Sequence, residues 1–149
     1  MNEELQTVLI KIQEILNDTN PVEQIESVLQ RLVSFGYTPT KDDVFTIAFS
    51  IQKVQHHIQN ETNQKIIPDG LFEVAVDMVC GEVLNVLYLS GKLELDNLDF
   101  GGIVNSVTEG DTSVSFDASG QDDDKIKQFI LWLTEGKGCD FLCYRKMRW

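Results

Sequence analysis

The chain has 149 residues, with 12 lysines and arginines against 24 aspartates and glutamates, so its formal charge at pH 7 is -12. Hydrophobic residues make up 42% and there are only 3 prolines and 10 glycines, which excludes collagen-like, low-complexity and wholly disordered chains. Such an acidic chain is also unsuited to wrapping around DNA, because affinity for phosphates comes mainly from lysine and arginine. The length predicts a single domain over residues 1–149.

The sequence predicts neither a signal peptide nor a membrane span. The first ten residues include two glutamates and no basic residue. The most apolar stretch, 71–89, contains Glu73, Asp77 and Glu82, and three acidic groups would be costly in the hydrocarbon of a bilayer. We therefore expect a soluble protein that has no membrane partner.

Four helices are predicted in the first 90 residues, because apolar side chains recur there every three or four positions. Asn20 and Pro21 are typical of the cap and the first position of a helix, and Gly36 is typical of a helix end. The first two helices are expected to form an N-terminal hairpin over 1–36, followed by a core over 40–136. The expected helix ranges are 3–17, 21–35, 41–62 and 69–89.

The fourth predicted helix is apolar on nearly all sides and keeps only a narrow polar stripe. A helix of this kind lies in the middle of a core or in an oligomer interface, so we expect it to be the most buried one. Gly81 in its middle costs roughly 1 kcal/mol relative to alanine. A close crossing with another helix at Gly81 would explain that residue.

The periodicity changes to alternation over 103–117, on both sides of Glu109-Gly110-Asp111. This pattern predicts a β-hairpin, and a last helix follows at 122–135. The expected fold class is therefore mainly α, with about five helices and one β-hairpin inserted before the last helix. A lone hairpin is marginally stable in water, so we expect this one to contact a neighbouring subunit. The residues assigned to that contact are Val107, Gly110, Val114 and Phe116.

No group of residues in the sequence predicts catalysis, so we expect no enzyme activity and no cofactor. There is no glycine-rich phosphate loop, nucleophile elbow or histidine-containing metal motif. His56 and His57 are adjacent, and on a helix they would point about 100° apart, which makes them a poor pair of metal ligands. The three cysteines are an odd number, which favours free thiols in a reducing compartment and no metal site.

The segment 137–149 is the one strongly basic part of this acidic chain, and it is also rich in aromatic residues. Tyrosine, arginine and tryptophan are enriched at the energetic centres of protein interfaces. We therefore predict that this segment docks on another chain. The alternative is that its aromatic residues pack on the core of their own domain. The residues assigned to docking are Tyr144, Arg145, Arg148 and Trp149.

Three stretches of the sequence resemble head–tail connector (adaptor) proteins of tailed bacteriophages and prophages in low-GC Gram-positive bacteria. The first combines Ile67–Leu71 with Val74–Glu82, the second is Val107–Phe116, and the third is Cys143–Trp149. Their order and spacing extend over most of the chain, and the opening stretch to about residue 16 carries least of the resemblance.

The resemblance implies a structural virion protein that forms a ring, commonly of twelve copies, beneath the capsid portal. Such a ring extends the DNA channel and offers an attachment surface to the next neck or tail component. Its implied partners are further copies of itself, the portal protein, a neck or tail completion protein, and double-stranded DNA that passes without sequence-specific binding. It would be made in the bacterial host cytoplasm and lie at the head–tail junction of the virion.

The acidity of the chain suits this implied role, because a channel wall that repels phosphates lets DNA slide. The resemblance also implies that a terminal segment reaches the portal. The alternative function is a soluble helical scaffold or regulatory protein with unrelated protein partners. A regulator that binds DNA is not favoured, because the sequence shows no basic recognition helix.

Overall fold

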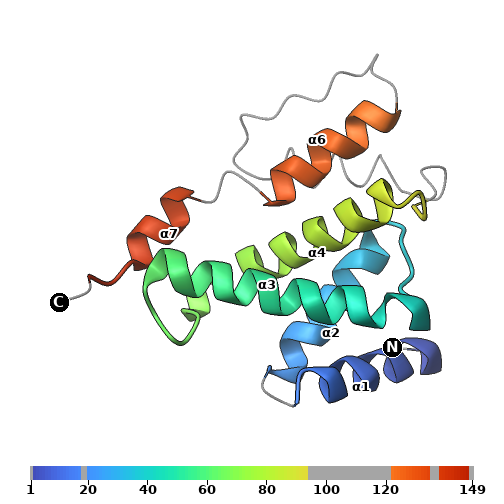
Figure 1. Ribbon diagram of the computed structural model, residues 1–149, viewed down its shortest axis with the longest axis horizontal. Coiled ribbons are helices and arrows are strands. Elements are labelled where there is room, and N and C mark those ends of the chain that lie inside the picture. Colours follow the sequence, from blue (N-terminus) through green and yellow to red (C-terminus); the bar gives the residue numbers. More distant parts are fainter. Residues whose placement is uncertain (1, 18–19, 94–121, 135–137, 148–149) are drawn as a thin grey trace.

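The computed structural model describes residues 2–17, 20–93, 122–134 and 138–147 (Figure 1). Two single-turn 3₁₀ helices, η1 (Lys41–Asp43) and η2 (Asp69–Leu71), lead directly into longer helices. Five of the α-helices match the five predicted ones to within a few residues. The α-helices of the described residues are α1 (Glu3–Ile15), α2 (Val22–Ser34), α3 (Val44–Thr62), α4 (Phe72–Leu89), α6 (Asp122–Thr134) and α7 (Gly138–Tyr144).

The predicted fold class is wrong, although the chain is mainly helical as expected. The described residues contain six α-helices and no β-strand. The hairpin predicted over 103–117 lies outside the described residues, and so do its four assigned contact residues. Alternation along the chain shows only which residues would share a face, and it does not supply the second apolar surface that a two-stranded hairpin needs. The sixth helix, α7, lies in the segment predicted as a docking tail.

Helix α4 lies at the centre of the molecule, where it packs against α2, α3 and α6 (Figure 1). Its apolar residues are buried around most of its circumference, as the sequence predicts. Val76, Val79 and Val83 are buried, whereas Val86 has 44% of its surface accessible. Helix α4 therefore lies in the middle of the core of a single chain. The buried residues of α4 are Ala75, Val76, Met78, Val79, Cys80, Gly81, Val83, Leu84 and Leu87.

The close crossing predicted at Gly81 is found between α4 and α6. A Cβ atom added to Gly81 would lie 2.6 Å from Cγ2 of Thr134 and 2.8 Å from Cβ of Leu133. Both distances are shorter than a normal contact between carbon atoms, which is 3.5–4.0 Å. The absence of a side chain at Gly81 therefore allows the two helices to approach each other this closely.

The N-terminal helices belong to the same core as the rest of the described chain. Helix α1 packs on α2 and α3, and α2 packs on α4. Asn20 does not cap α2, because the helix begins after Pro21 and has no side-chain cap. The Nδ2 atom of Asn20 donates instead to Oε1 of Gln24 at 3.1 Å and to Oε1 of Gln55 at 3.0 Å. Asn20 is buried and ties the connection between α1 and α2 to α3.

Candidate functional site

The C-terminal segment of the described chain is docked on the end of α3. Figure 1 shows α7 beside the last turns of that helix. Phe141 is only 5% exposed, and the centre of its ring lies 5.8 Å from that of His57 in an edge-to-face arrangement. Burial of a phenylalanine side chain stabilises a contact by roughly 2 kcal/mol, so Phe141 is the apolar anchor of α7.

After α7, the main chain is held by hydrogen bonds from the turn that ends α3. The Lys146 N–H donates to the carbonyl oxygen of Thr62 at 2.8 Å. In return, Nδ2 of Asn63 donates to the Lys146 carbonyl at 2.9 Å, and Nε2 of Gln64 donates to the Tyr144 carbonyl. We call the side chains of Asn63 and Gln64 the amide clamp. All three hydrogen bonds involve backbone atoms of the C-terminal segment.

Local sequence explains why the amide clamp lies at this place. Asn63 ends α3 in the left-handed conformation, with a φ of 55°. Asparagine tolerates this conformation better than most residues, which makes it a common helix terminator. This sharp turn keeps Gln64 beside the end of α3. The side-chain amides of Asn63 and Gln64 therefore both reach the main chain of the C-terminal segment.

Tyr144 lies against Gly70 in the turn that leads into α4. A Cβ atom on Gly70 would overlap the hydroxyl oxygen of Tyr144, so only glycine leaves room for the ring in this position. Tyr144 is half-buried and packs against the main hydrophobic core. The contact joins two stretches that carry the resemblance described above, Ile67–Leu71 and Cys143–Trp149.

Beyond these anchors, the segment presents basic and apolar side chains to solvent. Arg145 and Lys146 are exposed, and Leu142 and Met147 have 66% and 75% of their surfaces accessible. An arginine can bind a carboxylate through two parallel hydrogen bonds, and a flexible methionine adapts to an apolar pocket. The arrangement is therefore suited to an acidic protein surface that has an apolar recess.

The four residues predicted to dock on another chain differ in their positions. Tyr144 packs on its own chain, which is the alternative that the sequence left open for the aromatic residues of this segment. Arg145 is exposed, as a docking residue must be. Arg148 and Trp149 lie outside the described residues. A docking role for this segment stays a prediction.

The residues that hold the segment were missed by the sequence analysis. Asn63 and Gln64 lie in a polar run after α3, and Gly70 follows Pro68 and Asp69 in a common turn pattern. These signals indicate turns but do not reveal a partner about 80 positions away along the chain. Only the tertiary arrangement identifies them as contacts of the C-terminal segment.

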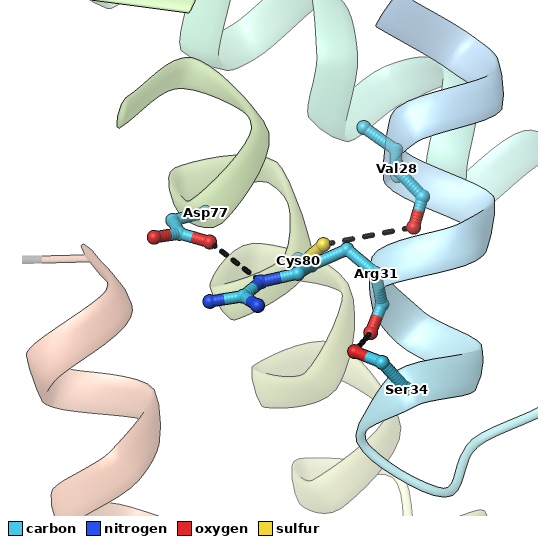
Figure 2. Close-up of polar contacts among 5 residues, drawn as sticks. All are labelled: Val28, Arg31, Ser34, Asp77 and Cys80. Carbon is cyan, nitrogen blue, oxygen red and sulfur yellow. Dashed lines mark hydrogen bonds and ion pairs between the residues drawn. The ribbon is translucent and has the colours of Figure 1, made fainter. Parts of the chain in front are cut away.

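A second group of polar contacts joins α2 to α4 (Figure 2). The Nε atom of Arg31 donates to Oδ1 of Asp77 at 3.1 Å, and the guanidinium lies 4.7 Å from the centre of the Phe35 ring. Beside this pair, the thiol of Cys80 donates to the Val28 carbonyl, with 3.7 Å between sulfur and oxygen. These contacts link the two helices beside their packed apolar residues.

Cys80 is poorly suited to nucleophilic chemistry. Burial raises the pKa of the Cys80 thiol well above its usual range, and the nearby Asp77 carboxylate raises it further. Because the thiolate is the reactive form, such a thiol is inert. Among the described residues, no three histidine, cysteine or acidic side chains are grouped as metal ligands. No helix in that part of the chain has the length and apolarity to cross a bilayer.

The surface formed by the C-terminal segment and the end of α3 is therefore the best candidate for a functional site. Comparison with known proteins adds no assignment: no family model matches the chain, and no curated protein or solved structure shows significant similarity to it.

Proposed function

We propose that the chain is a subunit of a head–tail connector ring of a tailed phage or prophage. In this role it docks on the capsid portal, extends the DNA channel and provides the attachment surface for the neck or tail. The ring has twelve copies, lies at the head–tail junction of the virion and is assembled from subunits made in the host cytoplasm. DNA passes through it without sequence-specific binding.

The observation that supports this proposal best is the way in which the C-terminal segment packs on its own chain. Two stretches that resemble connector proteins, far apart in sequence, meet where Gly70 accommodates Tyr144. This packing leaves Arg145, Lys146 and Met147 exposed at one end of the molecule. A docking element needs both properties, since it must be attached to its own subunit and accessible to its partner.

The geometry changes the role of one predicted residue. Tyr144 anchors the segment on its own core, while Arg145 provides the charged contact with the portal. Arg148 and Trp149 follow directly in sequence and extend the docking element in this proposal. The acidic remainder of the chain suits a ring through which DNA slides, because negative walls repel phosphates.

Charge reversal at Arg145 tests the proposal. Portal rings from the same phage or prophage are immobilised, and binding of the purified chain is measured by biolayer interferometry. Arg145→Glu should weaken binding at least tenfold, because it replaces an attractive contact with a repulsive one. Lys41→Glu is the matched control, since it makes the same charge change at an exposed position at the opposite end of α3.

Two outcomes contradict the proposal. If the unaltered chain does not bind portal rings, the connector assignment fails, and a helical scaffold with other partners becomes the better reading. If Arg145→Glu and Lys41→Glu weaken binding equally, the portal contact lies elsewhere on the chain.

A further inference from the structure

We infer that Asn63 and Gln64 are positioning residues, whose side-chain amides fix the direction in which the C-terminal segment leaves the core. Arg145 and Met147 are then presented in an ordered arrangement before any partner binds. The inference deepens the proposed function and rests on it for the identity of the partner. The clamp itself rests on the contacts of this chain alone.

The pattern of hydrogen bonds shows why the clamp sets a direction. Lys146 donates through its N–H and accepts through its C=O on the same side, as a residue of an extended chain does. Tyr144 precedes Lys146 by two residues, and its carbonyl accepts a hydrogen bond from the side chain of Gln64. Binding at two alternate residues of a main chain fixes its orientation as well as its position.

The clamp binds backbone atoms, so it does not depend on which side chains the segment carries. The side chains of Arg145, Lys146 and Met147 all remain exposed. Their chemistry is therefore free to match a partner while the amides of Asn63 and Gln64 hold the main chain. This separates the attachment of the segment from its recognition by another protein.

Asn63 has two roles that can be separated by substitution. Its left-handed backbone ends α3, and glycine would satisfy that conformation as well. Its side-chain amide binds the Lys146 carbonyl, which glycine cannot do. Asn63→Gly thus keeps the end of α3 and removes half of the clamp. Gln64→Met removes the other half at similar side-chain length.

Prior ordering is useful for docking because a mobile segment loses conformational freedom when it binds. A net contribution typical of one hydrogen bond corresponds to about a fivefold change in an equilibrium. Loss of both amides is expected to increase the population in which the segment is detached by about twentyfold.

Limited proteolysis measures this population directly, because trypsin cleaves after Arg145 and Lys146 only when the main chain is released. Cleavage of the native chain is followed by intact-protein mass spectrometry. Each single variant should be cleaved about fivefold faster and the double variant about twentyfold faster. Gln52→Met is the matched control, since Gln52 is an exposed amide on α3 outside the clamp. Circular dichroism should show unchanged helix content in all variants.

Unchanged cleavage of the double variant would overturn the inference, and so would equal acceleration in Gln52→Met. Portal binding provides the second arm: a twentyfold rise in cleavage leaves the attached state at about half of the population or more, so the double variant should bind at most about twofold more weakly. If cleavage accelerates and portal binding strengthens by a similar factor, the detached segment is the form that docks, and the positioning role of the clamp is overturned. If the unaltered chain never binds portal while the cleavage pattern holds, the proposed function fails and the clamp stands.

Discussion

At the scale of single residues, the two cysteines with described side chains differ sharply in environment. Cys80 is fully buried on α4, and its thiol donates a hydrogen bond to a carbonyl of α2. Cys143 is exposed at the end of α7. Reactivity of a thiol depends on access and on the thiolate fraction, so these two cysteines should react at very different rates.

A thiol titration checks this difference. In a Cys139→Ser variant at pH 8, 5,5′-dithiobis(2-nitrobenzoate) should modify Cys143 within minutes and Cys80 only after denaturant is added. Burial raises the pKa of Cys80 and blocks the reagent, which is why we expect two separate steps. Two thiols that react together in the folded protein would contradict the structure around α4.

Tyr37, Thr40 and Asp43 form a polar group at the start of α3. The Tyr37 hydroxyl donates to Oδ2 of Asp43 at 2.6 Å, and the Thr40 N–H donates to the same oxygen at 2.9 Å. Thr40 and Asp43 complete a capping box at the start of η1, which leads directly into α3. Burial, and then the bond to Asp43, raise the pKa of Tyr37 well above its usual value near 10.

A raised pKa in the folded state predicts a loss of stability at high pH. The hydroxyl binds its proton more tightly when folded, so its contribution is complete below the unfolded pKa near 10 and declines as the pH rises above it. Urea unfolding should show the free energy of unfolding falling from pH 10 to pH 11.5. Tyr37→Phe should fall less steeply over this interval, and parallel curves would contradict the predicted linkage.

At the scale of helices, several helices end at or just before a residue whose backbone has the left-handed conformation. Gly36 and Gly91 follow α2 and α4 with φ angles of 95° and 74°, and Asn63 ends α3. Glycine and asparagine reach this region with little strain, which is why the sequence located these ends well. The centres of the helices depend more on how they pack together.

Gly81→Ala tests the crossing of α4 and α6. Alanine is intrinsically better than glycine in a helix by about 1 kcal/mol, so an isolated helix would be stabilised. Here the added Cβ would lie 2.6 Å from a side-chain atom and 2.8 Å from a second one on α6, so the helices must separate. Overpacking of this kind costs about 2 kcal/mol, and we expect a net loss of stability in urea unfolding.

The matched control for this substitution is Glu73→Ala, at an exposed position of the same helix. Changes at exposed positions are usually within about 0.5 kcal/mol. If Gly81→Ala were more stable than the unaltered chain, helix propensity would outweigh packing, and the close approach of α4 and α6 would be contradicted.

At the scale of the whole molecule, charge is the dominant property. The net charge of -12 makes the folded state repel itself. The ion pairs between described side chains are Arg31–Asp77 at 3.1 Å and Lys53–Glu82 at 3.0 Å. Partly exposed pairs of this kind contribute at most about 1 kcal/mol each, so repulsion should outweigh them.

Added salt should therefore stabilise the protein. Between 20 and 500 mM sodium chloride, screening weakens the repulsion over distances beyond a few ångströms, while the two close ion pairs lose little. We expect the melting temperature, measured by differential scanning fluorimetry, to rise by about 3 °C. A melting temperature that falls with salt would show that attractive pairs dominate the charge distribution.

The sequence determined the five longer helices, the central place of α4 and the close approach at Gly81. Helical hydrogen bonds join residues four apart, so periodicity and turn residues carry this information locally. The sequence also drew attention to the basic C-terminal segment, in which Arg145 is exposed. The predicted fold class with a β-hairpin was wrong, because the described residues contain no β-strand, and the stretch 103–117 lies outside them.

The tertiary structure alone decided how the C-terminal segment is held. Helix α7 has seven residues, which is too short to be stable without the burial of Phe141 against α3. The amide clamp joins positions 80 and 83 residues apart, and Gly70 meets Tyr144 across a similar interval. Contacts between such distant positions depend on the packing of all the intervening helices, and no local pattern of residue types specifies that packing.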